Sequence, residues 1–165
     1  MKIKQLTEDI LPEVEMYYIK DYRDRKAYEG HYLHQNIEVD KKEMKWPFHK
    51  GDYVIFTDQP AVRYIMETLE PQAPDSYFAW NFFDGILGQK EGFSAYVFED
   101  MAAAFLQENP AIKKELEEKK NTDPDFAKDK WAQLRLVYSK TPHYEKTFNL
   151  YPIGRVIGDG KLPTE

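Results

Sequence analysis

The order in which hydrophobic patterns change along the chain predicts an α+β fold with an antiparallel sheet. Short β-rich stretches lie in the first third, at 14–19, 37–39 and 52–57, with a charged hairpin or loop at 21–26. The later two thirds is mainly helical in pattern, and strands do not alternate with helices as a parallel α/β fold requires. A late extended stretch, 148–157, is expected to return to the sheet. A small β-sandwich flanked by the helices is the alternative.

The first helix is predicted from one apolar stripe. Val62, Ile65, Met66 and Leu69 follow the spacing of a single helix face. Asp58 is expected to cap the N-terminus of this helix, because its carboxylate can accept from free amides in the first turn.

Further helices are predicted over 95–108, from Pro110, and from Pro124. Proline suits the first turn of a helix, where a missing N–H leaves no hydrogen bond unmade. The helix after Pro124 has four apolar residues at helical spacing: Ala127, Trp131, Leu134 and Tyr138.

Length and composition limit the class of protein. The 165 residues and the aromatic content of 15% indicate one compact domain over 1–157, and a flexible tail is expected over 158–165. The net charge of −6 argues against a nucleic-acid partner, and the absence of cysteine excludes disulfides and thiolate metal sites. No stretch approaches the ~18 apolar residues of a membrane-spanning helix.

The stretch 28–34 carries the densest group of candidate site residues: Tyr28, Glu29, His31, Tyr32 and His34. In a strand, Glu29 and His31 would face one side while Tyr28, Tyr32 and His34 faced the other. Only two of these side chains could then share a metal ion. The sequence therefore favours packing, or a contact with a ligand or another domain, over a metal site.

A second candidate is the aromatic run 77–83, in which Tyr77 and Trp80 are the residues selected. Aromatic side chains this dense are usually core. If partly exposed, they would form a platform for peptide or glycan, or a surface that docks on another domain.

The sequence identifies no catalytic group. It has no cysteine nucleophile, no Gly-x-Ser-x-Gly elbow and no glycine-rich phosphate loop, and His49 with Asp52 is interpreted as a surface turn. The isolated chain is therefore expected not to be catalytic and to carry no cofactor.

Several longer segments resemble one known family. GDYVIFTDQPAVRYIMETLEP, APDSYFAWNFFDGIL, YVFEDMAAAFL and NLYPIGRV are similar to the region downstream of the catalytic domain in large bacterial proteins of the zinc carboxypeptidase family. The resemblance extends over about 13–156. No His-x-x-Glu zinc pair is present, so none of the family's catalytic residues is carried over.

The resemblance implies a non-catalytic accessory domain that supports or orients an upstream peptidase domain of the same polypeptide. Zinc is expected only in that upstream domain. The implied location is periplasmic or extracellular, although the first residues, MKIKQLTEDI, lack the apolar stretch of a signal peptide. The alternative is an independent module that binds peptide or glycan.

Overall fold

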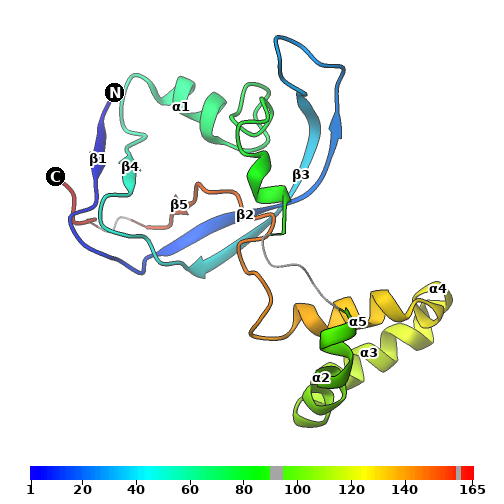
Figure 1. Ribbon diagram of the computed structural model, residues 1–165. Coiled ribbons are helices and arrows are strands. Elements are labelled where there is room, and N and C mark those ends of the chain that lie inside the picture. The colour runs from blue at the N-terminus through cyan, green and yellow to red at the C-terminus, as the bar shows by residue number, and fades with distance from the viewer. Residues whose placement is uncertain (90–94, 159–160) are drawn as a thin grey trace. The chain divides into compact units, whose positions relative to one another are not determined.

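The computed structural model describes residues 1–89, 95–158 and 161–165, and the chain forms two compact units (Figure 1). The sheet unit comprises Met1–Gly88 and Thr147–Glu165, and the helical unit comprises Gln89–Lys146. Antiparallel sheets together with helices confirm the predicted α+β class. The single compact domain predicted over 1–157 stays a prediction.

The larger sheet of the sheet unit has the strand order β3-β2-β5. The central strand β2 (Glu13–Asp24) pairs antiparallel with β3 (His34–Lys45) and with the short late strand β5 (Arg155–Val156). Val14 lies opposite Met44 on one side and Val156 on the other. The predicted return of the late segment to the sheet is confirmed.

Both faces of β2 are buried over 14–19, where side chains from other segments cover each face of the strand. Val14 and Met16 pack with Leu150 in one cluster, whereas Tyr17 and Ile19 point to the opposite face. The second cluster is completed by two large aromatic side chains, Phe78 and Tyr151. Residues from distant parts of the sequence therefore build this core.

A second, two-stranded sheet pairs β1 (Ile3–Gln5) with β4 (Tyr53–Ile55), with Ile3 opposite Ile55. The last residues of the chain join it, because the Thr7 amide donates to the Pro163 carbonyl at 2.9 Å and Thr164 forms a bridge with Leu6. The stretch predicted as a flexible tail thus ends in a segment paired beside β1.

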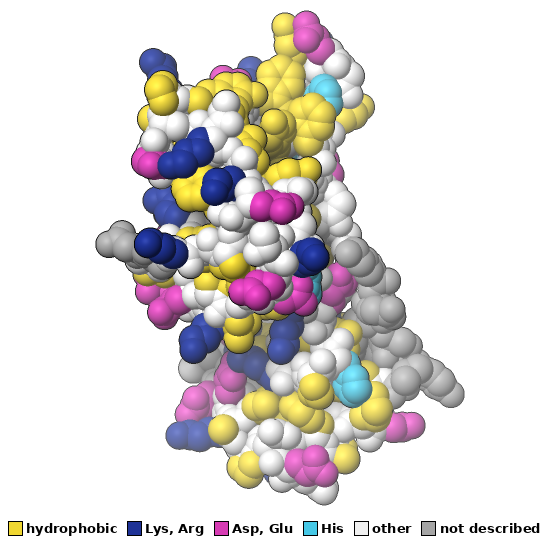
Figure 2. Space-filling model, turned by 90° about the vertical axis from the view of Figure 1, so that its left-hand side faces the viewer, with side chains coloured by type: hydrophobic (Ala, Val, Ile, Leu, Met, Phe, Trp, Pro, Cys, Tyr) yellow, Lys and Arg dark blue, Asp and Glu magenta, His cyan; other side chains and the backbone are white. Residues whose placement is uncertain are grey.

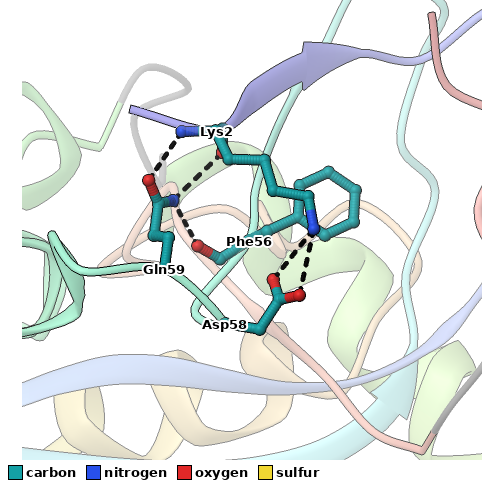
Figure 3. A network of polar contacts seen from close by, with 4 residues as sticks. All are labelled: Lys2, Phe56, Asp58 and Gln59. Carbon is teal, nitrogen blue, oxygen red and sulfur yellow. Dashed lines mark hydrogen bonds and ion pairs between the residues drawn. The ribbon is translucent and has the colours of Figure 1, made fainter.

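Lys2 connects the first strand to the loop that follows β4 (Figure 3). Its ammonium lies 3.0 Å from a carboxylate oxygen of Asp58 and 4.6 Å from the centre of the Phe56 ring. Its backbone amide donates to Gln59 Oε1 at 2.6 Å, and the Gln59 amide nitrogen donates to the carbonyls of Lys2 and Phe56. The hydrogen bond from Lys2 holds the pKa of the Asp58 carboxyl below its ordinary value.

This network explains why the predicted helix cap is wrong. Helix α1 (Val62–Leu69) begins after Ala61, which makes no side-chain cap, and the Asp58 carboxylate is bound by Lys2 instead. The predicted apolar stripe does form, and Ile65 is its buried member.

A 3-10 helix, η1 (Asp84–Leu87), ends the first segment of the sheet unit. The Asn149 amide donates to the Ile86 carbonyl at 2.9 Å. The two points at which the chain leaves and re-enters the sheet unit are therefore close together.

The described part of the helical unit holds four helices: α2 (Ala95–Glu108), α3 (Pro110–Thr122), α4 (Pro124–Lys128) and α5 (Lys130–Ser139). Their shared core consists of Phe98, Ala102, Leu116, Phe126 and Val137. Within the described ranges, no helix combines the length and the apolar character needed to cross a membrane.

The segment after Pro124 forms two helices, so the single predicted helix is wrong. Asp129 interrupts it, and the Asp129 carboxylate accepts from the Ala132 amide at 3.0 Å as the cap of α5. The break changes which side chains face inward. Trp131 is 62% exposed, whereas Val137 is buried.

Candidate functional site

The β2–β3 hairpin ends in a tight two-residue turn. The backbones of Tyr28 and His31 exchange two hydrogen bonds of 2.9 Å, and Glu29 and Gly30 between them have φ angles of 47° and 83°. Positive φ at both central residues is the geometry of a type I′ turn, whose twist matches that of antiparallel strands. Tyr28 and His31 are thus directly paired, whereas strand alternation had predicted that they face opposite sides.

The aromatic run 77–83 folds as successive turns fixed by Ser76. The buried Ser76 hydroxyl accepts from the Ala79 amide at 2.9 Å and donates to the Pro71 carbonyl at 3.1 Å. The Ala79 carbonyl in turn accepts from the His34 amide at 2.8 Å, which joins the run to β3. Phe78 is buried, and the prediction that the run is core is correct for it and for Ala79.

Three other rings of the run form a partly exposed cluster with the hairpin turn, whereas Phe83 packs against Tyr151 in the core. His31 lies 4.9 Å from Phe82 and 5.9 Å from Trp80 between ring centres. Tyr28 extends the cluster at 6.4 Å from Trp80, and Tyr77 extends it at 5.8 Å from Phe82. We call these five residues the aromatic face.

The aromatic face is open to solvent. Phe82 is 60% exposed and Tyr28 55%, and His31 and Trp80 are half-buried. Figure 2 shows hydrophobic side chains gathered around a histidine at the upper end of the sheet unit, where the hairpin turn lies. Two segments about 50 residues apart in sequence thus build one surface.

Two polar contacts hold the rings of the aromatic face in place. His31 Nδ1 lies 2.6 Å from Asn81 Oδ1, and the Trp80 indole N–H donates to Asp75 Oδ1 at 3.3 Å. Asn81 has a φ of 53°, a left-handed conformation that asparagine tolerates better than most residues. Each contact fixes a ring while leaving part of it exposed.

The structure brings together four of the residues selected from sequence: Tyr28, His31, Tyr77 and Trp80. Glu29 lies on the turn beside them and is exposed. Tyr32 is 62% exposed and has no ring contact with another described residue.

Phe82 and Asn81 belong to the site but were not selected from sequence. Both lie in the run 77–83, and the fold of that run brings them to the site. The left-handed backbone at Asn81 is the feature that a sequence could have suggested, since asparagine favours this conformation.

His34 is a structural residue, not part of the exposed site. It is buried, with Nδ1 at 2.9 Å from Asp24 and Nε2 at 2.8 Å from Asp84, and its ring lies 4.4 Å from that of Tyr22 and 4.9 Å from that of Phe78. Each ring nitrogen of His34 has a carboxylate oxygen as its hydrogen-bond partner. His34 therefore ties the hairpin to η1.

Other polar clusters in the described part of the chain do not build a second site of this kind. The His49 ring lies 3.5 Å from Asp9, and its backbone amide donates to Asp52, in an exposed turn. Among the residues that the structure describes, no group of three His, Asp or Glu side chains is placed to hold a metal ion. An open hollow beside Trp131 in the helical unit is lined mainly by exposed charged residues.

Comparison with protein-family models, with curated proteins and with solved structures found no match to the chain.

Proposed function

We propose that this chain is a non-catalytic binding domain and that the aromatic face is its binding surface. The observation that carries the proposal is the exposure of Phe82 and Tyr28 within a cluster whose rings contact one another. An exposed aromatic side chain contributes little to the free energy of folding, because most of its apolar surface stays in water. Exposed apolar clusters of this kind mark sites of ligand or protein contact.

Defined contacts also hold the aromatic face, which favours binding. The type I′ turn sets the position of His31, and the bonds to Asn81 and Asp75 orient two of the rings. A surface that is ordered before it meets its ligand loses less conformational entropy on binding.

The polar groups near the aromatic face suit binding better than catalysis. His31 is paired with a neutral amide, and His34 uses both ring nitrogens on carboxylates. A general base needs a nucleophile or a substrate proton within hydrogen-bond reach. Neither histidine has a Ser, Thr or Tyr hydroxyl as a hydrogen-bond partner among the described residues.

The resemblance to zinc carboxypeptidases supplies the proposed setting. In that setting the domain follows a peptidase domain in the same polypeptide, outside the cytoplasm, and supports or orients it. The support is the similarity of the segments in 51–87, 96–106 and 149–156 alone. The aromatic face would then hold a ligand near the peptidase domain.

The proposal that the domain is non-catalytic is tested by equilibrium dialysis of the chain against zinc and by incubation with C-terminal reporter peptides. We expect no tight stoichiometric zinc and no hydrolysis. Either a stoichiometric zinc ion that resists dialysis or measurable hydrolysis would overturn it.

The binding part is tested with a panel of immobilised peptides and glycans. Tyr28→Ala and Phe82→Ala remove exposed rings of the aromatic face. Tyr53→Ala is the matched control, because Tyr53 is 72% exposed on β4, at the other end of the sheet unit (Figure 1). We expect retention that both face variants lose and the control keeps. Absence of retention, or equal loss in the control, would refute the proposal.

A further inference from the structure

The hydrogen-bonding state of His31 restricts which ligand the aromatic face can take. The Asn81 side-chain oxygen at 2.6 Å can only accept, so His31 Nδ1 carries the proton in this contact. In a neutral imidazole the other nitrogen, Nε2, is then an acceptor. Nε2 has no hydrogen-bond partner among the described residues. The aromatic face thus presents an acceptor among aromatic rings, to which a hydroxyl or amide of a ligand can donate.

The exposed rings set the shape of the ligand. Phe82 contacts His31 and Tyr77 at interplanar angles of 47° and 85°, and it is still 60% exposed. None of these ring pairs is a parallel stack, so the Phe82 ring retains surface for a flat apolar group. A pyranose ring offers such a surface in its C–H face, with hydroxyl donors around its edge.

The charges at the aromatic face restrict the ligand further. Glu29 on the turn and Asp75 beside Trp80 are both exposed carboxylates, and the chain carries a net charge of −6. Uronic acids, sulfated sugars and phosphates would be repelled there, because like charges close together are unfavourable. A neutral ligand meets no such repulsion.

A proline-rich peptide is the main competitor, since such peptides also bind aromatic surfaces. Proline has no N–H, so it cannot donate to His31 Nε2. The Trp80 N–H, which could donate to a peptide carbonyl, is already used by Asp75. Both observations favour a ligand rich in hydroxyl donors.

We infer that the aromatic face binds a neutral glycan, with one pyranose ring packed on Phe82 and a sugar hydroxyl donating to His31 Nε2. This inference rests on the proposed binding function and adds the class of ligand to it. Asn81 acts as a positioning residue, because it holds the imidazole in the form that accepts at Nε2.

The experiment is isothermal titration calorimetry of the folded full chain with four probes. The probes are neutral hexasaccharides of glucose and of N-acetylglucosamine, a hexasaccharide of galacturonic acid, and a decaproline peptide. We expect at least one neutral hexasaccharide to bind, with an affinity that changes little between low and high salt.

Variants then locate the binding. We expect Phe82→Ala to lower the affinity for the neutral hexasaccharide about tenfold or more, through loss of the stacking surface. His31→Phe keeps an aromatic ring but removes the acceptor, so the affinity is expected to fall about five- to tenfold. Tyr53→Ala should leave it unchanged. Circular dichroism confirms that each variant is folded.

The outcomes separate the two proposals. Binding of decaproline, or of the acidic hexasaccharide, that depends on Phe82 would overturn the neutral-glycan inference and leave the binding function standing. Neutral-glycan binding that His31→Phe leaves intact would overturn the role assigned to Nε2. If no probe binds and the wider panel of peptides and glycans also gives no retention, both proposals fail.

Discussion

The hydroxyl of Tyr151 is a buried polar atom whose removal should stabilise the sheet unit. The side chain is fully buried, and the hydroxyl has no hydrogen-bond partner among the described residues. An unpaired buried polar group costs about 1–3 kcal/mol. The gap left by one oxygen atom costs ~0.3 kcal/mol by comparison. We therefore expect Tyr151→Phe to raise the free energy of unfolding by about 1 kcal/mol.

The same substitution at Tyr17 should have the opposite sign. Tyr17 is also buried, and its backbone carbonyl accepts a hydrogen bond from the Tyr151 amide. Unlike that of Tyr151, its hydroxyl has a partner, because it donates to Glu15 Oε1 at 2.6 Å. A hydrogen bond to a charged acceptor contributes about 1.5–3 kcal/mol. Tyr17→Phe is thus expected to lower the free energy of unfolding by about 1.5 kcal/mol. This matched pair separates the effect of the hydroxyl from that of the ring.

The gain from Tyr151→Phe should increase at alkaline pH. Burial, and secondarily the negative charge of Glu70, raise the pKa of the Tyr151 phenol above its ordinary value. A tyrosine in the unfolded chain ionises near pH 10, whereas the buried phenol of Tyr151 ionises at higher pH. The free energy of unfolding of the parent chain is therefore unaffected by this group below about pH 10 and falls by about 1.4 kcal/mol per pH unit above it. Phenylalanine does not ionise. The advantage of the variant should therefore be about 1.4 kcal/mol larger at pH 11 than at pH 7.

Urea-induced unfolding followed by tryptophan fluorescence measures these differences. The chain has three tryptophans, and Trp131 is the one that lies in the helical unit. A Trp131→Phe background, safe because that side chain is 62% exposed, makes the signal report the sheet unit. If Tyr151→Phe were less stable than its parent at pH 7, or if its advantage did not grow at pH 11, the hydroxyl would have a favourable partner and the reasoning would be refuted.

Two further predictions concern the hairpin turn and the close approach of Gly154 to Met16. Glu29 and Gly30 both have positive φ, which asparagine adopts more readily than glutamate and glycine more readily than alanine. Glu29→Asn should therefore stabilise the sheet unit by about 1 kcal/mol, and Gly30→Ala should destabilise it by a similar amount. A shift of the urea midpoint in the reverse direction for either variant would contradict the assigned turn. Gly154→Ala should cost about 1–3 kcal/mol, since its new methyl group would collide with the Met16 sulfur. Gly85→Ala is its control, with nothing within 4 Å of the added carbon and an expected change below about 0.5 kcal/mol. Equal urea midpoints for these last two variants would show that the Met16 side chain moves aside.

The elements that the sequence predicted well are those set by local pattern. Strand periodicity located β4 and the first half of β2, and apolar spacing located α1 with Ile65 inward. The stretch 21–24, predicted as part of a hairpin or loop, continues β2. The failures arise where a distant or unrecognised partner decides. Lys2 binds Asp58 and removes the expected cap, and the Asp129 cap breaks a helix and leaves Trp131 outside.

The candidate site was only half visible from sequence for the same reason. The stretches 28–34 and 77–83 were each selected, but their union depends on ring contacts between His31 and Phe82, which no local pattern encodes. The turn was missed because Glu29-Gly30 is not the usual Asn-Gly pair of a type I′ turn. His34 was grouped with its neighbours, although pairing with Asp24 and Asp84 places it inside.

The close approach of Ile86 and Asn149 has a consequence for the folding of the sheet unit. The helical unit is one continuous stretch, Gln89–Lys146, whereas the sheet unit needs chain from both sides of it. The segment Met1–Gly88 holds Tyr17 and Phe78 but not Tyr151, so it cannot complete their shared core alone. That core closes only when the chain beyond the helical unit returns to it.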